Sequence, residues 1–191
     1  MTTRATLAPG ALLASGAFLA ACSGVVTTPA YVDPSYEPAM LSYVAKAGPI
    51  YTQILGNPYG NQAEEAGRVI TTALQDAQFS GRPLTFVTAR PADTASPYRV
   101  VVLFNPAPAA NAAKICAEPE QPQAESGDGA VSVMVAFCES DRRVSSITGH
   151  TRDAATADAP NLDRLIRQAA TEIFSPRSIE RRDDIPDYET S

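Results

Sequence analysis

The chain has 191 residues, 45% of them hydrophobic, and it carries 15 basic against 21 acidic side chains, a formal net charge of −6 at pH 7. This is enough for one domain with a substantial core, but short for two. Sequence-independent binding of nucleic acid depends on Lys and Arg that neutralise phosphates. We therefore expect one acidic domain and no nucleic-acid partner.

Residues 1–21 have the layout of a bacterial export signal. Arg4 lies near the amino terminus and is followed by an apolar run over about residues 11–21. The run is shorter than the roughly 20 apolar residues that a membrane-spanning helix needs. It ends in the tetrapeptide Leu19-Ala20-Ala21-Cys22, which resembles the lipobox of bacterial lipoprotein precursors.

The resemblance implies that residues 1–21 are a signal peptide and that Cys22, once lipidated, becomes the first residue of the mature chain. Acyl chains such as palmitate would anchor the domain, since each buried methylene contributes roughly 0.8 kcal/mol. Ser23 stands where lipoproteins retained in the inner membrane usually have Asp. The resemblance thus implies the periplasmic face of an outer membrane. An ordinary cleaved signal with an incidental cysteine, or an uncleaved amphiphilic leader, are the alternatives.

Cys116 and Cys138 remain once Cys22 is assigned to lipid. An exported domain meets oxidising conditions, in which two such cysteines normally form a disulfide. Their spacing differs from the redox motif Cys-x-x-Cys, so we expect a structural bridge. His150 is the single histidine, and we expect neither a metal site nor a cofactor.

The first half of the mature chain predicts a tether and two helices. Residues 22–35 mix Gly, Ser, Thr and Pro without a hydrophobic period, which is typical of a flexible tether. Apolar residues at helical spacing predict a helix over 36–47. Residues 50–60 form a buried or half-buried segment that runs into a turn. A second helix is predicted over 61–77, with Asn61 as its cap and Glu64 at the capping-box position.

Strand-like runs follow at 84–88, 98–104 and 130–138, with a weaker one at 143–148. A short polar turn joins the last two into a hairpin. Between the second and third runs, residues 105–129 are rich in Pro, Ala and acids, and we expect a solvated loop whose first half is held by the disulfide.

The best amphipathic pattern covers 160–174, and residues 176–191 carry alternating charge clusters that predict a disordered tail. Residues 36–175 would then form a single domain. The element order predicts an α+β fold, with a four-stranded, mainly antiparallel sheet and the helices at 61–77 and 160–174 packed on one face.

No arrangement of residues indicates catalysis. His150 is the single candidate base, and no Gly-x-Ser-x-Gly turn presents a serine to it. The acidic pairs Glu64 with Glu65 and Glu118 with Glu120 lie at a helix start and in a loop, where side chains are poorly preorganised.

We therefore expect a non-enzymatic accessory or scaffold of the cell envelope, held on the membrane by its N-terminal lipid and in contact with an envelope protein. One alternative is a periplasmic binding module that receives a small molecule, peptide or lipid on the sheet face free of helices, together with loop 105–129. The other is a cell-envelope hydrolase, which a deep pocket holding His150 with Asp141 or Asp153 would favour.

Overall fold

The computed structural model describes residues 24–37, 39–77, 83–92, 96–124 and 129–174. The predicted signal peptide at 1–21, Cys22 and the predicted tail at 176–191 lie outside these ranges. In chain order the elements are β1 (Val25–Thr27), β2 (Tyr31–Val32), α1 (Met40–Ala47), β3 (Ile50–Leu55), the 3₁₀ turn η1 (Gly60–Gln62), α2 (Ala63–Asp76), β4 (Phe86–Val87), β5 (Tyr98–Phe104), β6 (Val131–Glu139), β7 (Arg142–Thr151) and α3 (Pro160–Phe174).

The fold is α+β, as predicted, but the sheet is larger and of another kind. Its order is β1-β7-β6-β5-β3-β4, with β2 also paired to β7, which makes seven strands among the described residues. β3 runs parallel to both β4 and β5, whereas β5, β6 and β7 are antiparallel. The prediction of four mainly antiparallel strands was therefore wrong in detail. The parallel pairing arises because α2 carries the chain from β3 back to the same end of the sheet before β4.

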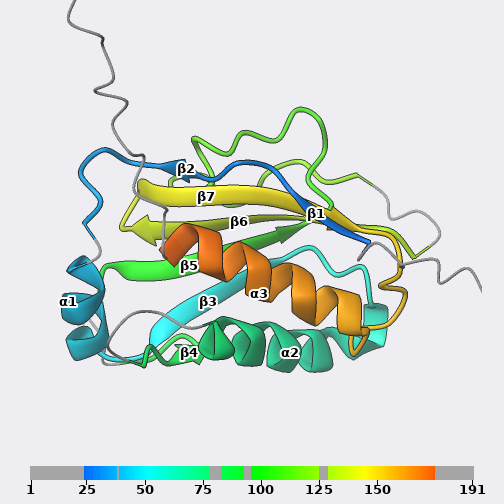
Figure 1. Cartoon of the computed structure of the whole chain (residues 1–191), viewed down its shortest axis with the longest axis horizontal. Coiled ribbons are helices and arrows are strands. Elements are labelled where there is room, and N and C mark those ends of the chain that lie inside the picture. Colours follow the sequence, from blue (N-terminus) through cyan, green and yellow to red (C-terminus); the bar gives the residue numbers. More distant parts are fainter. Residues whose placement is uncertain (1–23, 38, 78–82, 93–95, 125–128, 175–191) are drawn as a thin grey trace, which may run out of the picture.

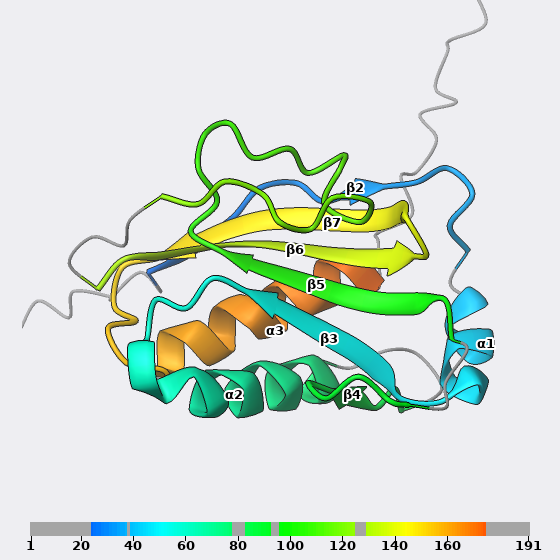
Figure 2. The same cartoon turned by 180° about the vertical axis from the view of Figure 1, so that it is seen from behind.

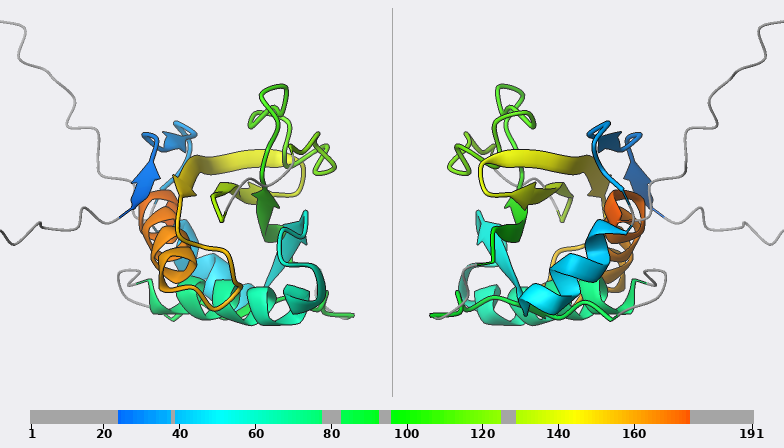
Figure 3. Two further views of the ribbon diagram at one scale, coloured as in Figure 1. Left: turned by 90° about the vertical axis from the view of Figure 1, so that its right-hand side faces the viewer. Right: turned by 90° about the vertical axis from the view of Figure 1, so that its left-hand side faces the viewer.

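The two long helices pack on one face of the sheet, as predicted. Figure 3 shows the sheet curving over α2 and α3, which lie side by side beneath it. The apolar stripe of α3 is fully buried, and Ser145 of β7 donates a hydrogen bond to the carbonyl of Ile173 at 2.8 Å. Gly149 permits this close packing, since a Cβ there would lie 2.7 Å from Cδ1 of Leu165.

The predicted flexible tether at 22–35 was wrong over its described part, because it belongs to the sheet (Figure 1). Val25 pairs with Thr151 and Tyr31 pairs with Ser146. The amide of Thr28, between the two short strands, donates to the carbonyl of Thr148 at 2.8 Å. The physical reason is that β7 would otherwise expose an unpaired edge, and the segment supplies its hydrogen-bonding partners.

The other predicted element boundaries differ less from those of the structure. Residues 50–55, expected only as a buried or half-buried segment, form β3 in the middle of the mixed sheet. α1 begins at Met40 rather than 36. Residues 60–62 form η1, so α2 begins at Ala63 and neither Asn61 nor Glu64 caps it. α3 has the predicted bounds of 160–174.

Candidate functional site

Loop 105–124 covers the part of the outer sheet face, opposite the helices, that is formed by β5 and β6 (Figure 2). Backbone hydrogen bonds order this loop, including that from Ala124 to Asn105 at 2.7 Å and that from Ala107 to Pro122 at 2.9 Å. The expected solvated loop is thus, over its described part, a layer of the domain. It closes a second apolar core, made by Val101, Leu103, Ile115, Cys116, Met134, Ala136 and Cys138.

A disulfide joins Cys116 in the loop to Cys138 in β6, which confirms the predicted pair. The S–S distance is 1.99 Å, the Cα–Cα distance is 5.7 Å, and both residues are fully buried. The bridge fixes the loop to the end of β6 next to the β6–β7 turn. Both cysteines belong to the second apolar core, and a disulfide buried among apolar side chains is typical of a structural bridge rather than of a reactive one.

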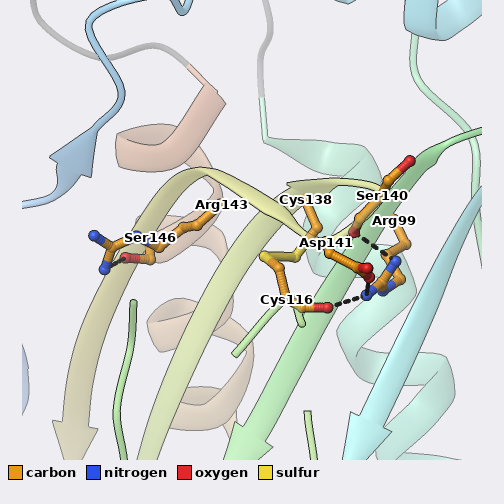
Figure 4. Close-up of a disulfide and its surroundings, with 7 residues drawn as sticks. All are labelled: Arg99, Cys116, Cys138, Ser140, Asp141, Arg143 and Ser146. Atoms are coloured by element: carbon orange, nitrogen blue, oxygen red, sulfur yellow. Dashed lines mark hydrogen bonds and ion pairs between the residues drawn. A yellow bond between two sulfur atoms is a disulfide. The ribbon is translucent and has the colours of Figure 1, made fainter. Parts of the chain in front are cut away.

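Arg99 of β5 secures the same loop, as Figure 4 shows. Its guanidinium donates to the carbonyl of Cys116 and, at 2.8 Å, to the carbonyl of Ser140 in the β6–β7 turn. A carboxylate oxygen of Asp141 lies 4.0 Å away, and the Arg99 side chain is only 16% exposed. One partly buried cation therefore ties the loop, β5 and the hairpin turn together. Sequence reasoning did not single out this arginine, because nothing local distinguishes it from a surface charge.

A polar cluster closes the end of the sheet that carries the β6–β7 turn. Arg142 forms ion pairs with Glu139 and, at 3.3 Å, with Asp33, which follows β2. The hydroxyl of Tyr98 donates to Glu139 at 3.0 Å. The hydrogen bond from Arg142 lowers the pKa of Glu139, and hydrogen bonds from Ser35 lower that of Asp33. Both carboxylates of this cluster, Asp33 and Glu139, are therefore held in ion pairs that join β2, β6 and β7.

Of the residues considered for catalysis, His150 and Asp141 lie at opposite ends of one strand, whereas Asp153 follows His150 by three residues and lies beside Gly24. His150 is exposed on β7, and Asp141 lies beyond the other end of that ten-residue strand, about 30 Å away at ~3.3 Å per residue. Glu65 pairs with Arg68, and Glu118 with Lys114. Within the described ranges, no group of three or more His, Cys, Asp or Glu residues is placed to hold a metal ion.

Two hollows on the surface are polar and open. The larger, of about 760 Å³, lies between the first turns of α2 and the strand β4 at the sheet edge, and Glu64, Arg68 and Thr88 are among its walls. The smaller, of about 290 Å³, lies beside Tyr51, over whose ring the guanidinium of Arg90 is placed at 5.5 Å. Most of the side chains around the larger hollow are polar or charged, whereas a typical small-molecule site is lined mainly by hydrophobic and aromatic side chains.

The start of β1 lies at the end of the sheet opposite α1 (Figure 1). Gly24 lies beside Asp153, because a Cβ on Gly24 would be 3.8 Å from that carboxylate. Residues 152–158 form an irregular loop at this end, and the amide of Ala157 donates to Gln62 of η1 at 3.3 Å. The described segment nearest to Cys22 is thus part of one end of the folded domain. In the described part of the chain, no helix is long and apolar enough to cross a membrane.

Comparisons with known proteins give little. No protein-family model matches the sequence, and no curated protein matches it either. Two structures of PelC from Paraburkholderia phytofirmans, both described as dodecamers and one carrying a point substitution, are similar at TM-scores of 0.38 and 0.37 with 12% and 9% identity. They cover 80% of this chain and 95–96% of theirs. Likeness at this level gives no ground for transferring a function or an assembly.

Proposed function

We propose that this chain is a lipid-anchored accessory protein of the cell envelope, held by Cys22 at the periplasmic face of the outer membrane of a double-membraned bacterium, and that it works by holding a protein partner rather than by catalysis. The lipobox is the sequence feature behind the anchor. The observation that carries the proposal is the pairing of Val25 with Thr151 only three residues after Cys22.

That pairing matters because it makes the anchor continuous with the sheet. A domain on a long flexible tether samples many orientations. A domain whose third residue after the cysteine is already hydrogen-bonded into β7 stays close to its anchor and samples fewer orientations. Restricted orientation is what a scaffold needs, since a partner must meet the same surface each time.

Two further observations favour a scaffold. The face proposed for a bound ligand in the alternative is occupied by loop 105–124 and its disulfide. At the end of the domain away from β1, Tyr43 of α1 is 70% exposed, and the ammonium of Lys46 lies 5.9 Å from the centre of its ring. Exposed tyrosines are enriched in protein interfaces.

The test is purification of the lipidated protein from mildly cross-linked envelopes, with mass spectrometry of the proteins and small molecules recovered. We expect a stoichiometric envelope protein that cross-links to the parent. It should be lost or depleted for Tyr43→Ser and retained for Thr171→Ser, a change at an exposed position of α3. A co-purified small molecule or lipid without a protein partner would contradict the scaffold and establish the binding module instead.

A further inference from the structure

We propose that the end of the domain formed by Gly24, Gly129 and the loop 152–158 rests directly on the lipid headgroups of the membrane. This end is called the membrane-facing surface below. The inference rests on the proposed function in one respect, namely the lipid on Cys22. Beyond that function, it identifies the surface of the domain that contacts the bilayer and the surface that stays accessible to a partner.

The two residues from Cys22 to Gly24 limit how far Gly24 can lie from the lipid anchor. Successive Cα atoms along an extended chain are separated by at most ~3.6 Å per residue, so the Cα of Cys22 lies within about 7 Å of that of Gly24. The acyl chains of a lipidated cysteine enter the hydrocarbon region, and the headgroup layer outside it is only about 5–8 Å thick. Gly24 is therefore confined to the outer limit of the headgroups or just above them.

The fold determines which other residues lie as close to the membrane as Gly24 does. Asp153 lies beside Gly24, and the amide of Ala154 donates to the carbonyl of Gly129 at 3.0 Å. Val25 is 8% exposed and paired to Thr151. Because β1 is bound to β7 at this point, the loop 152–158 cannot lie far from the membrane unless β1 detaches.

The surface has the chemistry of a headgroup contact rather than of an inserted segment. Its exposed side chains are Arg152, Asp153, Ala155, Thr156 and Asp158, around a shallow hollow of about 470 Å³. None of these is a large apolar residue that would enter the hydrocarbon. The guanidinium of Arg152 can meet the phosphate of phosphatidylethanolamine, and the carboxylates of Asp153 and Asp158 can meet its ammonium group.

The opposite end is correspondingly far from the membrane. β7 has ten residues and runs from the hairpin beside α1 to the membrane-facing surface, a span of about 30 Å at ~3.3 Å per residue. Figure 1 shows α1 and the start of β1 at opposite ends of the domain. Tyr43 thus faces the periplasm, where a protein partner can reach it.

The test places a benzophenone amino acid at Thr156 or at Tyr43 of the full lipidated protein in vesicles of phosphatidylethanolamine with a minor fraction of phosphatidylglycerol. Both positions are exposed in the free domain. On irradiation we expect phospholipid adducts at Thr156 and none above background at Tyr43. Inserting about 20 Gly and Ser residues between Ser23 and Gly24 gives the domain a reach of roughly 25 Å, and the adducts at Thr156 should then be lost.

Other results overturn the inference. Adducts at Tyr43 in place of Thr156 would mean the opposite orientation. Equal adducts at both, or adducts at Thr156 that survive the insertion, would mean that the pairing of β1 does not hold the domain down. The lipid on Cys22 is read separately from the intact mass of each sample. An unacylated chain refutes the proposed function itself, whereas an acylated chain without adducts at Thr156 refutes only the membrane-facing surface.

Discussion

Removing the disulfide should destabilise the domain by about 3 kcal/mol. The change is Cys116→Ala with Cys138→Ala, made in a soluble form that lacks residues 1–21 and carries Cys22→Ser, so that lipid plays no part. The sequence separation of 22 residues enters the loop-closure relation as an entropy of about 11 cal/mol/K, or roughly 3.4 kcal/mol at 25 °C. That corresponds to a factor of a few hundred in the unfolding equilibrium.

The assay is urea unfolding followed by circular dichroism, with thermal unfolding as a second measurement. We expect the melting temperature to fall by roughly 10 °C, given the size of the domain. Amide exchange should quicken most in loop 105–124. It should change little in β1, which the bridge does not touch. A double variant within about 0.5 kcal/mol of the parent would refute the loop-closure reasoning, since two buried alanines alone cannot compensate for the lost constraint.

Replacing Arg99 tests the attachment of loop 105–124 by a second route. Arg99→Met keeps an unbranched apolar stem but leaves the carbonyl of Cys116 without its charged donor, which should lower the free energy of unfolding by about 1–3 kcal/mol. Combined with the cysteine variant, the two losses should be less than additive, because both changes release the same loop. Strict additivity would mean that the arginine and the disulfide stabilise separate parts of the structure.

Three further changes test other parts of the fold. Gly149→Ala should lower the free energy of unfolding by about 1–3 kcal/mol, because the added Cβ would collide with Leu165 of α3 and with Thr27 of β1. Unchanged urea unfolding would contradict this packing. Tyr36→Phe should lower the free energy of unfolding by about 1–2 kcal/mol in the same assay, since it removes the buried hydrogen bond from the Tyr36 hydroxyl to the carbonyl of Phe174; a neutral result would mean that this hydrogen bond makes no net contribution to stability. The pKa of Glu139 is lowered in the folded state by Arg142, so its stabilisation is present above the unfolded pKa and is lost as the pH falls through the folded one. The parent should therefore exceed Glu139→Gln in stability near neutral pH and lose that advantage below about pH 4; a constant difference would exclude this linkage.

The elements that could be predicted from sequence are those whose signal is local. The bounds of α3 follow from one apolar stripe that starts at Pro160, and those of β5 from seven consecutive strand-forming residues. Both sides of β5 are apolar, which correctly indicated a central strand. The disulfide was predictable because two cysteines remained after Cys22.

The elements that sequence reasoning missed depend on partners far away in the chain. β1 and β2 have three and two residues, and they form because the edge of β7 lies free about 120 residues later. The parallel pairing of β3 with β5 likewise depends on the crossover through α2. Loop 105–124 has the composition of a solvated segment, yet Ile115 and Cys116 bury it against the sheet. Composition measures average solubility, whereas two well-placed apolar side chains decide where a loop packs.

The lipid anchor on Cys22 is tested most directly by mass spectrometry of the N-terminal peptide, released from protein purified out of the bacterial envelope. The resemblance to lipoproteins predicts a chain that begins at Cys22 and carries a diacylglyceryl group on its thiol, with the modification absent from Cys22→Ser. A mature chain with a free Cys22 thiol, or a chain that retains residues 1–21, would contradict the anchor. It would also remove the physical basis for a domain held against the membrane through β1.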